Sequence, residues 1–417
     1  MDQSIQARAH LVSRYLPREI SGQVEMLLRN SPVVIVTGMR QVGKSTMLVN
    51  DPLLKDREYI SLDDLALLEA SNENPDSMLR SYGPLTIDEA QRSDALFLAI
   101  KRSVDRKREA GRFLLSGSAS FELRKSVSES LAGRAVYLRM MPLTRRETLG
   151  GTKRKPFLLR FMESPGKRMR MDDIKPVSNK EIVAGGMPPV VLASEEEAQV
   201  WLMGYEQNYV ERDIRYISRV DNIVGFRNVL RLLAARTGQI LNVSQVARDA
   251  ALPVKTTFRY LGWLENLFLV YRLQTYHGGR TKRVRKAPKI FVSDTGLACH
   301  LSGCTDLAGD PMRGHIVESY VAQNLLGILN SHTLAWNLYY WRNDTGLEVD
   351  FVIENKRETL AIEVKAGESW SKRDLKGLRA FLSAVPGCKA GILAYNGTEM
   401  INLGDRIWAV PMGLLLS

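Results

Sequence analysis

Short apolar runs separated by amphipathic stretches characterise the first third of the chain. The runs lie at residues 33–37, 57–62, 84–88 and 112–117. Strands that alternate with helices predict a parallel sheet covered by helices on both faces. A basic stretch punctuated by glycine and proline follows at 150–176, and it predicts an insertion or a flexible loop. From 194 to 219 the pattern is helical and charged.

The middle of the chain, from about 221 to 293, has three helical stretches and then a basic, strand-like piece. Two short helices flank a turn at Ala251-Leu252-Pro253, which is the helix-turn-helix arrangement. Apolar runs at 268–272 and 289–292, on either side of Gly278-Gly279, can form a hairpin. These features predict a winged helix-turn-helix that binds DNA. The alternative is a helical domain that contacts only proteins.

The last part of the chain mixes helical and strand patterns. The pattern predicts a helix at 316–329, strands at 338–342, 347–354 and 359–365, a helix at 372–382 and a strand at 391–395. The fold class expected for the whole chain is therefore α/β and multidomain.

The apolar run 33–37 leads directly into a glycine-rich loop. The loop reads Gly38-Met39-Arg40-Gln41-Val42-Gly43-Lys44-Ser45, with Thr46 and a helical pattern after it. A strand, this G-x-x-x-x-G-K-S loop and a helix together are typical of a phosphate-binding P-loop. We expect the backbone N–H groups of the loop to surround the phosphates, Lys44 to reach the β- and γ-phosphates, and the Ser45 hydroxyl to hold Mg²⁺. The sequence thus predicts a nucleoside triphosphate site. It does not indicate which base is bound, so ATP and GTP are not distinguished.

Three further features suit nucleotide hydrolysis. Asp88 and Glu89 end the third apolar run, where Asp88 would hold Mg²⁺ and Glu89 would polarise the attacking water, as in a Walker B element. The alternative is a solvated acidic pair. Ser116 and Ser118 end the fourth run, where a polar side chain can sense the γ-phosphate. Arg134 would act as an arginine finger on a neighbouring subunit's nucleotide, or it is an ordinary surface arginine.

Composition bounds the partners and the compartment. A chain of 417 residues is long enough for two to four domains. The formal charge of +12 favours a polyanionic partner, either nucleic acid or an acidic membrane surface. Three cysteines without a CxxC spacing predict reduced thiols of a cytoplasmic protein. We expect no membrane insertion and no secretion, because the chain has no long apolar run and no secretory leader.

Basic residues gather in two segments, at 153–170 and at 272–289, and the second segment contains no acidic residue. One interpretation is that the first segment is a solvated loop and the second a solvated hairpin, with no binding role. Next to a helix-turn-helix, the second segment instead favours contacts to DNA phosphates. The DNA-binding residues expected from the second helix and the hairpin are Lys255, Thr256, Thr257, Arg259, Arg280, Lys282, Arg283, Arg285 and Lys286.

A second site is predicted near the C-terminus. Asp350 is followed, about a dozen residues later, by Glu363-Val364-Lys365. Residues i and i+2 of a strand share a face, so Glu363 and Lys365 project together. A carboxylate followed by E-x-K is the spacing of a Mg²⁺-dependent nuclease centre, to which Glu318 on the preceding helix would add a ligand. The alternative is a nuclease-like fold without activity.

These motifs together resemble a known family. Further matching segments are Tyr209–Asp213, Lys286–Lys289 and Asp294–Leu297. The chain resembles prokaryotic AAA-type P-loop ATPases that carry a winged helix and a C-terminal domain of unknown function related to restriction endonucleases, the PD-(D/E)xK fold. The resemblance implies an ATPase domain at 1–190, a helical linker or lid at 191–220, a winged-helix DNA-binding domain at 221–300 and a restriction-endonuclease-like domain at 301–417. It also implies ATP as the nucleotide. The basic insertion at 153–170 departs from the family.

The function expected from these features is a DNA-stimulated ATPase. It would form a homo-oligomeric ring, such as a hexamer, and use ATP and Mg²⁺ to move on or remodel duplex or branched DNA, for example in junction branch migration or as a helicase. Two alternatives stay open. One is a nucleotide-controlled switch or scaffold that binds proteins, and the other is an ATP-gated, metal-dependent DNA nuclease.

Overall fold

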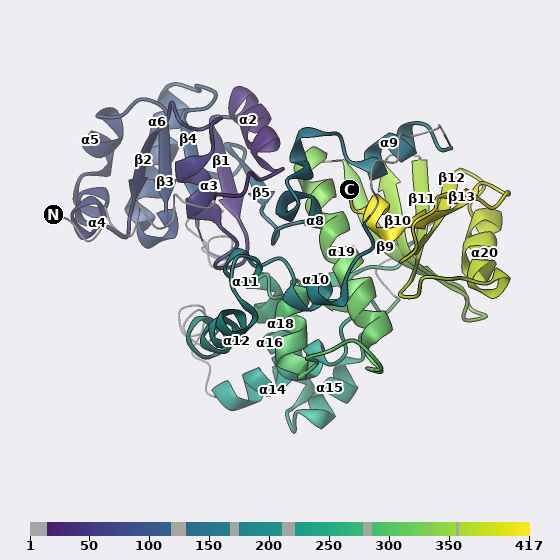
Figure 1. Ribbon diagram of the computed structural model, residues 1–417. Helices are drawn as coiled ribbons and strands as arrows, with labels where there is room; N and C mark the ends of the chain where they lie inside the picture. Colours follow the sequence, from purple (N-terminus) through teal and green to yellow (C-terminus); the bar gives the residue numbers. More distant parts are fainter. Residues whose placement is uncertain are drawn as a thin grey trace.

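The computed structural model describes residues 15–117, 131–166, 175–210, 222–277, 286–333, 335–355 and 358–417. A parallel sheet formed near the N-terminus and a mixed sheet formed near the C-terminus lie on either side of one long central helix, and a helical region lies below them (Figure 1). A single buried apolar cluster runs from Ile20 to Leu416 and joins these parts. Within the described residues, no helix is both long and apolar enough to cross a membrane.

The N-terminal sheet has five parallel strands in the order β2-β3-β4-β1-β5. Its strands are β1 (Val33–Thr37), β2 (Glu58–Ser61), β3 (Leu85–Asp88), β4 (Phe113–Ser116) and β5 (Ala135–Arg139). The four predicted strands are confirmed, whereas β5 was not predicted. All carboxyl ends of a parallel sheet meet at one edge, so the ends of β1, β3 and β4 lie together.

Alternate residues of β1 face two different apolar cores, because successive side chains of a strand point to opposite faces. Val34 and Val36 belong to the central cluster, and Val33 and Ile35 belong to a second cluster on the other face. The first face is covered by α2 (Ser21–Asn30) and α3 (Lys44–Asn50). The second face is covered by α4 (Leu65–Glu73), α5 (Pro75–Arg80) and α6 (Asp94–Arg106), while the turn η1 (Ala90–Arg92) follows β3.

Short helices lead from this sheet to the rest of the chain. They are α8 (Arg145–Thr148), η3 (Gly151–Lys153), α9 (Phe157–Glu163), α10 (Asn179–Ala184), α11 (Pro188–Val191), α12 (Glu195–Gly204) and the π-helical turn η4 (Tyr205–Val210). The prediction of a flexible loop at 150–176 is wrong for the first half of the segment, which forms η3 and α9, while an insertion stays a prediction. Phe157 and Phe161 of α9 are fully buried, and Phe161 packs edge-on against Trp408. Residues 167–174 lie outside the described part.

The helical region contains α14 (Ile223–Ala234), α15 (Val243–Asp249), α16 (Val254–Asn266) and α18 (Thr295–Ser302). Between them runs a three-stranded antiparallel sheet in the order β6-β8-β7, made of β6 (Gln239–Ile240), β7 (Val270–Leu273) and β8 (Lys289–Val292). Helices α14, α15 and α16, followed by strands β7 and β8, match the predicted order of three helices and then strands. Strand β6, between α14 and α15, was not predicted. The expected turn between β7 and β8 falls on residues 278–285, which are outside the described part.

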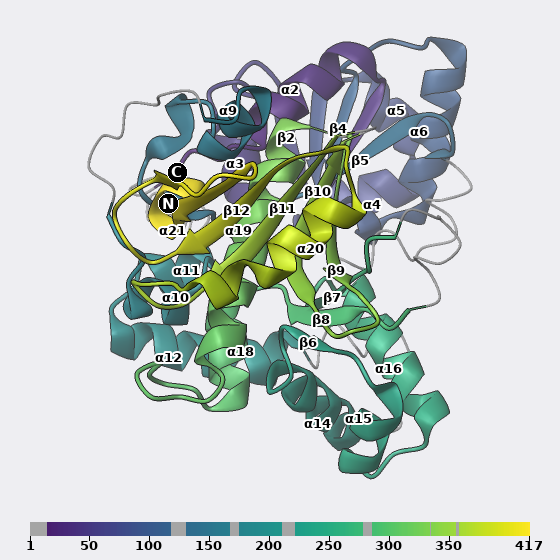
Figure 2. The same cartoon turned by 90° about the vertical axis from the view of Figure 1, so that its right-hand side faces the viewer.

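The C-terminal region is built on a six-stranded mixed sheet in the order β13-β14-β12-β11-β10-β9. Its elements are α19 (Arg313–His332), β9 (Trp336–Arg342), β10 (Glu348–Asn355), β11 (Glu358–Lys365), η5 (Lys372–Leu375), α20 (Lys376–Ala384), β12 (Cys388–Tyr395), β13 (Ile401–Asn402), β14 (Ile407–Pro411) and α21 (Met412–Leu415). Helix α20 covers one face of the sheet and α19 lies behind the other (Figure 2). The predicted helices and strands are confirmed, and β13, β14 and α21 are additional.

Candidate functional site

The P-loop connects β1 to α3, as the sequence predicts. Gly43 caps α3 with a φ of 91°, a left-handed conformation that side chains rarely adopt. Lys44 is the first residue of the helix, and its Nζ donates to the carbonyl oxygens of Gly38 at 3.1 Å and Met39 at 2.8 Å. The ammonium group is therefore held within the loop, where it can meet phosphate oxygens.

The loop is supported from behind by Arg18, a residue that was not predicted. This buried guanidinium donates to the carbonyl oxygen of Val42 at 2.6 Å and to that of Met141 at 2.6 Å. It also pairs with the carboxylate of Glu147 at 3.0 Å. Arg18 thus ties the P-loop to the segment that follows β5.

The acidic pair Asp88-Glu89 stands at the carboxyl edge of the same sheet. Asp88 is buried and accepts a hydrogen bond from the Tyr59 hydroxyl at 3.0 Å. Glu89 adopts a φ of 51° and accepts a hydrogen bond from the amide of Gln91. Burial, and then the charge of Asp88, raise the pKa of Glu89. A carboxylate of raised proton affinity beside a phosphate loop suits a group that polarises water.

Ser116 lies between these two elements. Its strand β4 is sandwiched between β1 and β3, with Ser116 opposite Val36 in the pairing register. The side chain is fully buried, and its Oγ has no hydrogen-bond partner among the described residues. A buried hydroxyl without a partner carries a desolvation cost, which a ligand oxygen at this edge would relieve. Ser118 is outside the described part.

The residues at this edge fit a magnesium ion. The Ser45 hydroxyl is on an exposed residue at the start of α3, and the carboxylate of Asp88 faces the same edge from β3. Both supply the hard oxygen ligands that Mg²⁺ prefers, and a nucleotide phosphate would supply others.

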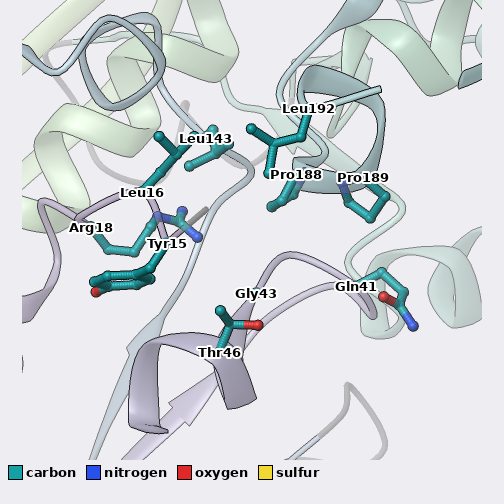
Figure 3. A pocket seen from close by; sticks show the side chains of 10 residues that line it. All are labelled: Tyr15, Leu16, Arg18, Gln41, Gly43, Thr46, Leu143, Pro188, Pro189 and Leu192. Atoms are coloured by element: carbon teal, nitrogen blue, oxygen red, sulfur yellow. The ribbon is translucent and has the colours of Figure 1, made fainter. Parts of the chain in front are cut away.

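A cavity of about 240 Å³ opens beside the P-loop (Figure 3). Its walls come from the segment before α2, from the P-loop and from the α11 region. The lining residues are Tyr15, Leu16, Arg18, Gln41, Gly43, Thr46, Leu143, Pro188, Pro189 and Leu192. Mostly apolar walls next to a phosphate loop can take a flat nucleotide base. The sequence did not reveal this cavity, because its three walls are far apart along the chain.

Arg134 lies at the opposite edge of the sheet. It directly precedes β5, whose first residue Ala135 pairs with Val33, the first residue of β1. Five strand residues, roughly 15 Å, separate it from the P-loop of its own chain. Its guanidinium forms a two-pronged ion pair with Asp105, at 2.6 and 2.9 Å. Any contact of Arg134 with a nucleotide would therefore involve another subunit.

The second helix of the predicted helix-turn-helix is α16, and its residues differ in exposure. Lys255 and Arg259 are exposed and Thr256 is half-buried. The prediction that Thr257 is available for contacts is wrong, because it is 1% exposed and its hydroxyl donates to the Pro253 carbonyl at 3.2 Å. Tyr260 is likewise buried.

The basic hairpin is described only at its end. Lys286 is exposed and pairs with Asp344 at 3.3 Å. The other predicted DNA contacts, Arg280, Lys282, Arg283 and Arg285, lie outside the described part.

The C-terminal residues selected from the sequence do gather. Glu363 and Lys365 share a face of β11, with Lys365 Nζ 3.0 Å from Glu363 Oε1. Asp350 lies on the neighbouring strand, and its Oδ2 accepts a hydrogen bond from the N–H of Val364 at 2.9 Å. Burial, and then the charge of Asp350, raise the pKa of Glu363 to about 8.

Glu318 reaches the same cluster from α19, but its nearest partner was not predicted. Lys289 Nζ on β8 lies 2.7 Å from Glu318 Oε1. Burial raises the pKa of Glu318, and the negative charge of Asp350 adds to this effect. In the sequence, Lys289 belongs to the basic segment 272–289 and to the family-matching segment Lys286–Lys289, but neither of these linked it to the carboxylates.

Comparison with protein families divides the chain into three matched segments. Residues 30–149 match the AAA domain. Residues 178–308 and 313–415 match two domains of unknown function, DUF8612 and DUF4143 respectively. The match and the geometry at the edge of the N-terminal sheet agree, so this part of the chain is an AAA-type P-loop ATPase domain.

Similar proteins are found in bacteria and archaea. The uncharacterized protein Rv2008c of Mycobacterium tuberculosis is 30% identical over 408 residues, which cover 96% of this chain and 84% of that protein. The uncharacterized protein MJ1544 of Methanocaldococcus jannaschii is 24% identical and covers 93% of this chain and 88% of that one.

Among solved structures, the Walker-type ATPase PABY2304 of Pyrococcus abyssi is similar at 15% identity and a TM-score of 0.42, over 70% of this chain and 99% of that one. The RuvB Holliday junction branch migration motor of Thermotoga maritima is similar at 16% identity and a TM-score of 0.28, over 65% of this chain and 90% of that one. At these scores the structural likeness is partial.

Replacing Ser116 by alanine should separate catalysis from stability. The variant loses a buried hydroxyl that has no described partner, so its free energy of unfolding should stay within about 1 kcal/mol of the wild type. If the hydroxyl contacts the γ-phosphate, steady-state ATP hydrolysis should fall by about tenfold or more. Ser293→Ala is the matched control, because Ser293 is also fully buried and its Oγ also has no described partner, but it follows β8. Equal hydrolysis by both variants would exclude a role of Ser116.

Stability should depend on pH through Glu363. Its pKa is raised in the folded state from 4.5 to about 8, so the folded chain binds this proton more tightly than the unfolded chain. The resulting stabilisation is complete below pH 4.5 and disappears as the pH rises through about 8. The melting temperature should therefore fall from pH 5 to pH 8, and Glu363→Gln should flatten this dependence. An identical pH profile for wild type and variant would contradict the raised pKa.

Proposed function

This chain belongs to the same protein family as the uncharacterized mycobacterial protein Rv2008c, and we propose that it is an ATPase that couples hydrolysis to movement on, or remodelling of, duplex or branched DNA. The observation that carries the proposal is the meeting of Lys44, the Asp88-Glu89 pair and the unpartnered Ser116 hydroxyl at one edge of the parallel sheet. The AAA domain match at residues 30–149 supports hydrolysis in general terms.

Each group at this edge has a step that it can perform. Lys44 would bind the phosphates, and Ser45 and Asp88 would hold a Mg²⁺ ion, whose charge would stabilise the transferring phosphoryl group. Glu89 accepts a proton from the attacking water, consistent with its raised pKa. The cavity beside Gly43 and Thr46 takes the base.

The DNA part of the proposal rests on the helical region and on charge. Helices α15 and α16 follow one another around a tight turn, and α16 contacts β7 of the three-stranded sheet, which supports a helix-turn-helix followed by a wing. Lys255 and Arg259 are exposed on α16. A formal charge of +12 supports a polyanionic partner.

We further propose a ring of identical subunits in which Arg134 reaches a neighbour's nucleotide. The residue stands on the far edge of the sheet from its own P-loop, which is the position that an arginine finger acting between subunits requires. In this arrangement the contact between subunits would release Arg134 from Asp105.

ATP hydrolysis in Mg²⁺, measured with and without duplex and four-way-junction DNA, tests the central proposal. Hydrolysis should rise several-fold on addition of DNA, and Lys44→Ala should abolish both the basal and the stimulated rate. Hydrolysis that is indifferent to every DNA would instead favour a nucleotide-controlled switch or scaffold whose partners are proteins.

If the subunits form a ring, substitution of Arg134 should reduce hydrolysis specifically. Arg134→Ala should keep nucleotide binding but lose hydrolysis by about a hundredfold or more, because the transition-state charge loses its guanidinium. Arg102→Ala is a matched control, since Arg102 also pairs with an exposed aspartate, Asp76, next to the same sheet. Fluorescent-nucleotide binding and phosphate release measure the two properties. Unchanged hydrolysis in Arg134→Ala would remove the finger from the proposal.

A further inference from the structure

Two of the carboxylates that the sequence assigned to a metal centre, Glu318 and Asp350, lie around an ammonium group, together with Glu348. Lys289 Nζ lies 2.7 Å from Glu318 Oε1, 2.5 Å from Glu348 Oε1 and 3.4 Å from Asp350 Oδ1. The lysine side chain is only 4% exposed. The carboxylates stand on α19 and β10 of the C-terminal region, whereas the lysine comes from the three-stranded sheet of the helical region.

As they stand, these residues do not fit a divalent metal ion. The second oxygen of Asp350 is already bonded to the N–H of Val364, and Glu363 is already bonded to Lys365. Among the described residues, no group of three or more His, Cys, Asp or Glu side chains is arranged to hold a metal ion. A cation that used the same oxygens would also lie next to the positive charge of Lys289, and the two would repel each other strongly at that distance.

The structure holds Lys289 firmly in this position. Strand β8 is the central strand of its sheet, bonded to β6 on one side and to β7 on the other. Phe291, two residues on, packs against Phe351 of β10 with ring centroids 6.3 Å apart. The Tyr340 hydroxyl donates to the Ala287 carbonyl at 2.5 Å. The backbone that carries Lys289 is therefore held against the carboxylates as long as the sheet is docked on the C-terminal region.

We propose that Lys289 is a built-in cation that closes the nuclease-like centre to divalent metal ions. While the three-stranded sheet is docked, the carboxylates form ion pairs with its lysine. In this arrangement the C-terminal region is a clamp for the helical region rather than a nuclease. The divalent-cation site exists only when the ammonium is removed. This inference does not depend on the proposed ATPase activity.

Manganese binding by the nucleotide-free, full-length protein tests the proposal, with free Mn²⁺ followed by its electron paramagnetic resonance signal. Lys289→Met keeps the apolar stem and removes the ammonium, so it should bind Mn²⁺ about tenfold more tightly than the wild type, or better. Adding Asp350→Asn should abolish that gain. Lys289→Arg keeps the charge and should behave as the wild type.

Lys286→Met is the matched control, because Lys286 is exposed and its one ion pair among the described residues is with the exposed Asp344. It should bind Mn²⁺ no better than the wild type. A folded Lys289→Met chain without a gain in Mn²⁺ binding would overturn the proposal. If Lys289→Met does not fold, the comparison of wild type with Asp350→Asn decides. Equal Mn²⁺ binding supports a closed centre, and binding that disappears in Asp350→Asn overturns it.

Discussion

The structure depends on hydrogen-bond and ion-pair partners for the buried polar side chains of one helix, α19. An unpaired polar group in an interior costs about 1–3 kcal/mol, so each of these side chains needs a partner. Each partner comes from a different part of the chain. The bonds join Glu318 to Lys289 of β8, Ser319 to Thr237 before β6, Gln323 to Thr295 of α18 and Asn324 to Arg145 of α8. The helix thus specifies how the three regions dock, in a way that apolar contact alone would not.

Buried ion pairs extend this constraint to the nucleotide site. Arg146 of α8 pairs with Glu19 at 2.6 Å, and Glu147 of the same helix pairs with Arg18. Removing one partner of such a pair leaves a buried charge, so these bonds are expensive to break singly. Arg18 also donates to the Val42 carbonyl of the P-loop, and the N–H of Arg145 in α8 donates to Asn324 of α19, so a chain of bonds runs from the P-loop through α8 to α19. A physical connection therefore exists between the phosphate site and the C-terminal region.

The two sites differ in how far the sequence predicted them, and the reason is distance along the chain. Residues 38–46 and the Asp88-Glu89 pair were predicted because a strand, a loop and a helix in succession form the P-loop locally. The apolar wall of the cavity was not predicted, because Tyr15, Thr46 and Pro188 meet only after folding. The loop prediction at 150–176 failed for a similar reason. The polar residues around Phe157 and Phe161 suggested a loop. The segment is a helix, and its Phe161 packs against Trp408, which is far along the chain.

By itself, the sequence determined four of the five strands of the N-terminal sheet, the phosphate loop with its acidic partner, and the shared face of Glu363 and Lys365. All of these follow from short-range periodicity and from spacing. Only the tertiary structure decided that Thr257 is buried, that Arg134 stands at the far edge of its sheet, and that Lys289 lies among the carboxylates of the C-terminal region. Those outcomes depend on which surfaces are buried against each other, and a buried ammonium finds its counter-charges through space rather than along the chain.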